Sequence, residues 1–76
     1  MTNIVLPELG GGITKATVAC WHARLGGRVN AGDAIVEVVT DKATFCIEAP
    51  VDGIIKTIFV PQGTEGMVGA VLGTIE

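Results

Sequence analysis

The stretch Val39-Thr40-Asp41-Lys42-Ala43-Thr44 lies just past the middle of the chain, between two runs that alternate like half-buried strands. Residues 35–40 lead into it and residues 44–48 lead out of it, so it is expected to form the tip of a β-hairpin. It contains no glycine, which disfavours a type I′ turn because that turn needs a positive φ at both central residues. A type I turn with Asp41 and Lys42 at its centre is therefore predicted.

This hairpin would place Lys42 at its apex, from where the side chain is expected to project into water with nothing to pair against. A rigid, exposed amine without a partner is a poor arrangement for a structural lysine and a good one for covalent attachment. The other lysines, Lys15 and Lys56, lie on strand-like runs with ordinary surroundings. Lys42 is therefore the candidate site of modification.

The remaining segments predict an all-β domain. Residues 4–6 are expected to form a short strand, and residues 14–25 one strand or two separated by a bulge. Residues 65–69, which contain two glycines, are expected to form a turn between edge strands. Other turns are predicted at Asn30–Asp33, Asp52-Gly53 and Pro61–Gly63. No segment has a helical period, so the expected architecture is a flattened β-barrel, or a sandwich of two small antiparallel sheets.

Trp21 is predicted to be a core anchor, because it alternates with small apolar residues along a strand-like run. The same alternation turns Cys20 and His22 outward, and burial of Ile47 turns Cys46 outward. A single disulfide is left open by the sequence, but two outward thiols favour a reducing cytoplasm. His22 has no nucleophile beside it in a triad pattern and is interpreted as a solvated strand residue.

The composition limits the functions open to the chain. A length of 76 residues allows one domain with a thin core. The net charge of -3, with only five Lys and Arg residues, argues against nucleic-acid binding, which needs a basic patch. One histidine and two dispersed cysteines do not support a zinc site. No signal peptide is visible in residues 1–12, and no run approaches the roughly 20 apolar residues of a membrane span.

The pattern of glycines and apolar residues recurs after a shift of 37 residues, which places Gly63 on Gly26 and Gly69 on Gly32. The inward apolar positions recur with it, although few are identities. Two similar halves related by an approximate two-fold axis are therefore expected. Under that symmetry the counterpart of the lysine turn is the point where the chain ends, so the termini should meet on the side opposite Lys42.

Taken with their spacing, these residues resemble the lipoyl domains of 2-oxo acid dehydrogenase complexes. Thr40-Asp41-Lys42-Ala43 has Gly26 sixteen residues before the lysine and Gly53 eleven after it, as in that family. Further matching segments are Leu6-Pro7-Glu8-Leu9-Gly10, Trp21, Glu48-Ala49-Pro50 and Val68-Gly69 with Leu72 and Ile75. The resemblance covers nearly the whole chain. It also implies that the loop of Gly10-Gly11-Gly12, which lacks the signature of a phosphate site, lies beside the lysine turn.

The resemblance implies that residues 1–76 form a lipoyl-carrier domain, the N-terminal part of a larger acyltransferase chain and monomeric in isolation. Lys42 would carry covalent lipoate, with Asp41 and Ala43 forming the recognition turn, and the domain itself would catalyse nothing. Lipoate-protein ligase or a lipoyl transferase would attach the cofactor. A thiamin-diphosphate-dependent 2-oxo acid decarboxylase, a transacylase domain using coenzyme A and a dihydrolipoamide dehydrogenase would then be its partners.

Two other functions fit a barrel of this kind. A biotin carrier has a similar fold with a lysine at the same hairpin, but it characteristically flanks that lysine with methionines, where this chain has Asp41 and Ala43. An unmodified structural or interaction module would make Lys42 an ordinary solvated residue. The motif and its frame of glycines favour the lipoyl carrier.

Overall fold

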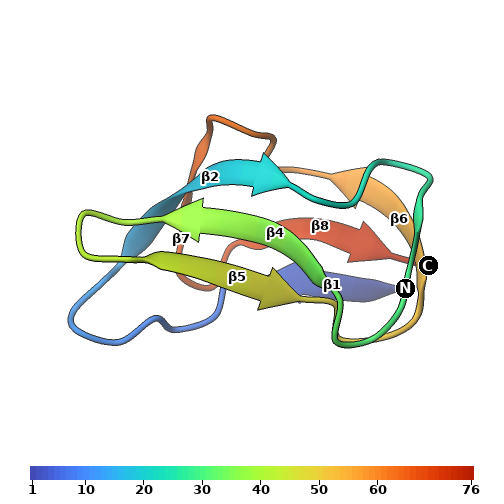
Figure 1. The fold of residues 1–76 in the computed structure, drawn as a ribbon, viewed down its shortest axis with the longest axis horizontal. Coiled ribbons are helices and arrows are strands. Elements are labelled where there is room, and N and C mark those ends of the chain that lie inside the picture. Colours follow the sequence, from blue (N-terminus) through green and yellow to red (C-terminus); the bar gives the residue numbers. More distant parts are fainter.

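The computed structural model describes all 76 residues and contains eight strands and no helix. The strands are β1 (Thr2–Val5), β2 (Lys15–Trp21), β3 (Arg28–Val29), β4 (Ala34–Val39), β5 (Thr44–Glu48), β6 (Gly53–Ile58), β7 (Glu65–Met67) and β8 (Val71–Ile75). They form two antiparallel four-stranded sheets with the orders β1-β8-β6-β3 and β5-β4-β2-β7, packed face to face (Figure 1). The predicted flattened sandwich is therefore confirmed.

The two sheets repeat the same strand order with equivalent strands. The 37-residue shift carries β2, β3 and β4 onto β6, β7 and β8, and β5 and β1 occupy matching edges. Hydrogen bonds repeat as well: the Gly26 amide donates to the Ile55 carbonyl at 2.8 Å, and the Gly63 amide donates to the Val18 carbonyl at 2.8 Å. Gly26 and Gly63 also have similar positive φ values of 81° and 85°. The predicted two-fold relation is confirmed.

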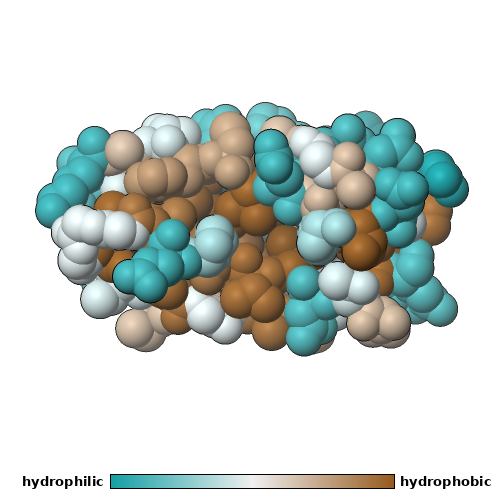
Figure 2. Space-filling model, turned by 90° about the horizontal axis from the view of Figure 1, so that it is seen from below, coloured by the Kyte–Doolittle hydropathy of each residue, from teal (hydrophilic) through white to brown (hydrophobic).

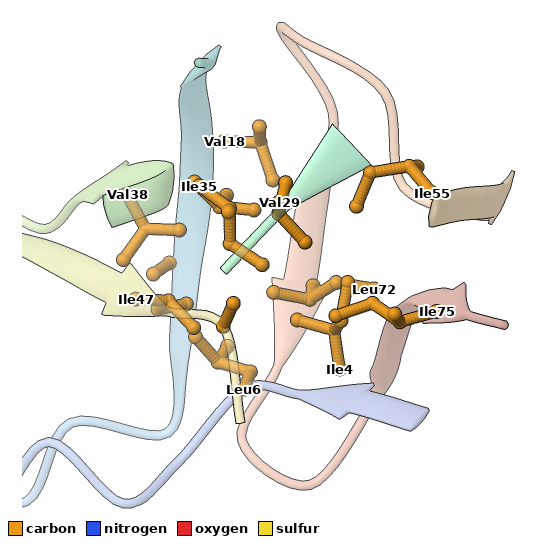
Figure 3. Close-up of a cluster of buried hydrophobic side chains, with 13 residues drawn as sticks. Ile4, Leu6, Val18, Val29, Ile35, Val38, Ile47, Ile55, Leu72 and Ile75 are labelled. Carbon is orange, nitrogen blue, oxygen red and sulfur yellow. The ribbon is translucent and has the colours of Figure 1, made fainter. Parts of the chain in front are cut away.

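The core consists of small and branched apolar side chains from both sheets. Thirteen buried residues make one cluster, and Figure 3 shows their side chains converging between the sheets. Among them Ile35, Ile55 and Leu72 are almost completely inaccessible to solvent. Trp21 is half-buried and packs against this cluster, and its indole N–H donates to the Val60 carbonyl at 2.8 Å. The core role predicted for Trp21 is confirmed, at the margin of the cluster.

Three local predictions need correction. Residues 65–67 form β7, because they find a partner in β2, where Ala16 faces Gly66. The strand predicted over 14–25 ends at Trp21, and Leu25 lies in an exposed loop. The first strand begins at Thr2 and ends at Val5, two residues before Pro7. The predicted bulge is present, as a register shift between Val18 and Cys20.

The hairpin of β4 and β5 projects at one end of the molecule, and both termini lie at the other end (Figure 1). The molecule is elongated, with principal extents of 31 × 20 × 16 Å. The two-fold relation explains this placement, since it pairs the hairpin tip with the junction between β8 and β1. No helix long and apolar enough to cross a membrane is present.

Candidate lysine attachment site

The tip of the β4–β5 hairpin is held by the side chain of Thr40. Its hydroxyl oxygen accepts the backbone N–H groups of Lys42 at 3.1 Å and Ala43 at 3.0 Å, and the hydroxyl itself lies 3.0 Å from the Ala43 carbonyl. The Thr40 amide also donates to the Ala43 carbonyl at 2.8 Å. Asp41 and Lys42 occupy the centre of the turn, and neither has a positive φ, as predicted. A threonine that caps its own turn lets the hairpin close tightly without glycine.

The Lys42 side chain is exposed, but it has a partner that the sequence did not predict. Its Nζ donates to the backbone carbonyl of Gly11 at 3.0 Å, across a separation of 31 residues. The expectation of an amine with nothing to pair against is therefore wrong in this respect. Lys42 forms no salt bridge, and the one hydrogen bond of its Nζ goes to a neutral carbonyl at the surface.

A groove of about 630 Å³ runs from the lysine turn along the glycine loop. It is lined by Gly11–Thr17, Val39–Lys42 and Glu65. The loop therefore lies beside the turn, as the family resemblance implied. The groove is open, and its apolar members are Ile13, Ala16 and Val39.

The other two lysines differ from Lys42 in their partners. Lys15 Nζ lies 3.5 Å from a carboxylate oxygen of Glu65, and Lys56 Nζ lies 3.3 Å from a carboxylate oxygen of Glu76. Acylation of either amine would remove a positive charge and leave a carboxylate without its ion pair. Acylation of Lys42 leaves no carboxylate without an ion pair, and in this respect Lys42 differs from Lys15 and Lys56.

The remaining chemically active side chains lie on the outer face of the second sheet. Cys20 and Cys46 are free thiols, half-buried and exposed respectively, and they project from β2 and β5 on either side of Glu37. His22 Nε2 lies 3.4 Å from Glu37, and its Nδ1 lies 4.0 Å from the Cys20 sulfur. No group of three or more His, Cys, Asp or Glu side chains is arranged to hold a metal ion.

Figure 2 shows the face on which the edge strands β1 and β5 lie, with apolar residues gathered in its hollowed centre. The shallow groove between these strands has a volume of about 440 Å³ and is lined by Asn3–Val5, Pro7, Cys46–Glu48 and Pro50. It contains no lysine and lies away from the hairpin tip.

The sequence predicted Lys42, Asp41 and Ala43 as the site, and the structure places the three together at the turn; the hydrogen bonds that Thr40 and Gly11 make there were not predicted. Thr40 had a usable signal, since a threonine just before two turn residues is typical of turns capped by a side-chain oxygen. Gly11 had none, because a contact between a carbonyl and a lysine 31 residues away leaves no local pattern. Ala43 is exposed beside the lysine and leaves its flank open.

Comparison with known proteins places these features in a family. The family model described as "Biotin-requiring enzyme" matches residues 2–75. The pyruvate dehydrogenase complex protein X component of Chaetomium thermophilum is 40% identical over 65 residues, which are 86% of this chain and 15% of that protein. The succinyltransferase component of the 2-oxoglutarate dehydrogenase complex of Rickettsia typhi is 38% identical over 73 residues, which are 96% of this chain and 18% of that protein.

A solved structure agrees with these relatives. The lipoyl domain of the 2-oxoglutarate dehydrogenase complex from Azotobacter vinelandii superposes with a TM-score of 0.80 at 32% identity, covering 100% of this chain and 96% of that one. The chain spans less than a fifth of the length of the two curated relatives, 15% and 18%, and almost the whole of the solved domain. The chain therefore belongs to the biotin and lipoyl attachment-domain family, and it has the fold of a lipoyl domain of a 2-oxo acid dehydrogenase complex.

Proposed function

We propose that this domain carries lipoate in amide linkage to Lys42. The observation that carries the proposal is that Lys42 alone among the three lysines stands at a hairpin apex and forms no salt bridge. Its one partner is the neutral Gly11 carbonyl at 3.0 Å, so loss of the positive charge on acylation leaves no carboxylate unpaired. The open groove beside it gives a ligase access to the amine.

The chain supplies position rather than chemical activation. A free carboxylate has no leaving group that an amine can displace, so a lipoate-protein ligase or lipoyl transferase must present lipoate with an activated carboxyl group. The deprotonated amine attacks the carboxyl carbon, the C–N bond forms, the activating group leaves, and the proton passes to solvent. Thr40 holds the turn that aims the amine, and Asp41 and Ala43 give the ligase its recognition turn.

Lys42 would hold the lipoyl group, whose disulfide would be reduced as it takes up the acyl group at a thiamin-diphosphate-dependent decarboxylase; the acyl group would go to coenzyme A at a transacylase domain, and dihydrolipoamide dehydrogenase would reoxidise the dithiol. The domain contributes a stable platform whose termini lie opposite the lysine (Figure 1). A tether leaving from that end keeps the arm free and raises its effective concentration at each partner. We also propose that residues 1–76 are one domain of a larger acyltransferase chain, as the chain's small share of its relatives' length suggests, and that this chain is cytoplasmic, which suits its two free thiols.

The experiment is the intact mass of the purified domain after incubation with lipoate-protein ligase, lipoate and ATP, followed by peptide mapping. One lipoyl group on Lys42 is expected, and none on Lys42→Ala. Lys15→Ala and Lys56→Ala are matched controls and should accept lipoate at the wild-type rate. Addition of biotin by biotin ligase without addition of lipoate would establish the biotin-carrier alternative, and no addition by either ligase would favour an unmodified module.

A further inference from the structure

The glycine loop, Gly10–Gly12, accepts a hydrogen bond from Lys42 through one atom, the carbonyl oxygen of Gly11. Gly10, Gly11 and Gly12 have consecutive positive φ values of 77°, 60° and 76°, a backbone conformation that side chains larger than glycine rarely adopt. The loop closes on itself through the Ile13 amide, which donates to the Gly10 carbonyl at 3.0 Å. The Gly11 carbonyl accepts no backbone N–H, and its only protein donor is Lys42 Nζ.

Of the three loop glycines, only Gly11 lies close to Lys42. A Cβ added at Gly11 would lie 3.9 Å from Lys42 Nζ, whereas a Cβ added at Gly10 or Gly12 would meet nothing within 4 Å. The loop is otherwise exposed, with no buried anchor of its own at these three positions. Its order therefore depends on the hydrogen bond to Lys42 more than on packing.

We infer that Gly11 is a positioning residue for the arm: its carbonyl accepts an N–H of Lys42 Nζ both in the free amine and after the amine becomes an amide. This inference rests on the proposed function. An ammonium group carries three N–H donors, and an amide nitrogen at the same place keeps one. Because the Gly11 carbonyl is the only protein acceptor of Nζ, one donor is enough to preserve the contact.

The contact gives the arm a defined starting direction. Lys42 and Gly11 both line the groove that also contains Ile13, Thr14 and Val39, so their hydrogen bond would fix Nζ at the wall of this groove. An exposed hydrogen bond is weak, so a partner enzyme can release the arm without a large barrier. The lysine and the loop would thus order each other, and the loop conformation would report whether the arm is held or free.

The first test uses the unmodified domain and needs no lipoate. Backbone ¹⁵N relaxation is measured for Gly10, Gly11 and Gly12 in the wild type and in Lys42→Met, whose unbranched side chain is one atom shorter and lacks the donor. The order parameters of the loop are expected to fall from about 0.85 toward about 0.6 or lower. Lys15→Met is the matched control: it lines the same groove, contacts Glu65 rather than the loop, and should leave the loop unchanged.

The second test places Nε-acetyllysine at position 42 by genetic encoding, which supplies the amide N–H without any ligase. Loop order parameters equal to those of the wild type support retention of the hydrogen bond. Values equal to those of Lys42→Met, or an unchanged loop in Lys42→Met itself, would overturn the inference. Since neither protein depends on lipoylation, failure here is distinct from failure of the ligase experiment, which would overturn the carrier function instead.

Discussion

Truncation of Trp21 to Ala tests whether the domain depends on its single tryptophan. The ring packs against the core cluster from a half-buried position, and its indole N–H donates to the Val60 carbonyl at 2.8 Å. Removal of a large aromatic side chain from a core destabilises by about 3 to 5 kcal/mol, and the partial exposure of Trp21 places it near the lower value. The lost hydrogen bond is part of that figure, at about 1 kcal/mol.

A domain of this length has a free energy of unfolding of about 4 to 11 kcal/mol. A loss of about 3 kcal/mol lowers the melting temperature by about 12 to 24 °C, since each kcal/mol corresponds to about 4 to 8 °C at this size. The assay is thermal unfolding followed by far-ultraviolet circular dichroism, because the variant lacks the tryptophan needed for fluorescence. Trp21→Phe is the control: it keeps most of the packing, loses the N–H donor and should shift by about 4 to 8 °C. A Trp21→Ala melt within about 3 °C of the wild type, less than 1 kcal/mol, would refute the core assignment.

Three further perturbations test other parts of the structure. Gly73→Ala should lower the free energy of unfolding by about 1 to 3 kcal/mol in guanidinium, because the added Cβ would lie 2.5 Å from the Thr57 carbonyl oxygen. An unchanged free energy of unfolding would contradict the close packing of Gly73 against Thr57. Thr74→Val should stabilise by about 1 kcal/mol in the same assay, since the Thr74 hydroxyl is buried without a hydrogen-bond partner. Exchange of Asp41 and Lys42 should preserve a cooperative melt but abolish lipoylation, because a one-residue step along the hairpin turns the amine to the other face; equal lipoylation rates would contradict an aimed lysine.

Local patterns in the sequence predicted the central hairpin correctly. The alternation on either side of residues 40–43 reflects strands with one face in the core, and the absence of glycine disfavoured a turn with positive φ, which the structure does not have. The repeated glycines predicted the two-fold relation, because Gly26 and Gly63 occupy equivalent left-handed positions. These features are local or periodic, so a single chain displays them without its partners.

The short edge strands could not be predicted in the same way. β3 contains two residues and β7 three, too few for an alternation to be read. β7 is a strand because its backbone pairs with that of β2. β3 is a strand because its backbone pairs with that of β6. The two glycines of residues 65–69 predict a turn, and the pairing of β7 with β2 overrides that preference.

The sequence by itself determined the fold class, the hairpin and the identity of the lysine at its tip, because strand alternation and turn chemistry act between near neighbours. Only the tertiary structure decided what that lysine contacts. Lys15 and Lys56 meet Glu65 and Glu76, whereas Lys42 meets the carbonyl of Gly11. These contacts join residues that the folding of the sheets brings together, and a contact made to a backbone carbonyl leaves no side-chain pattern in the sequence to reveal it.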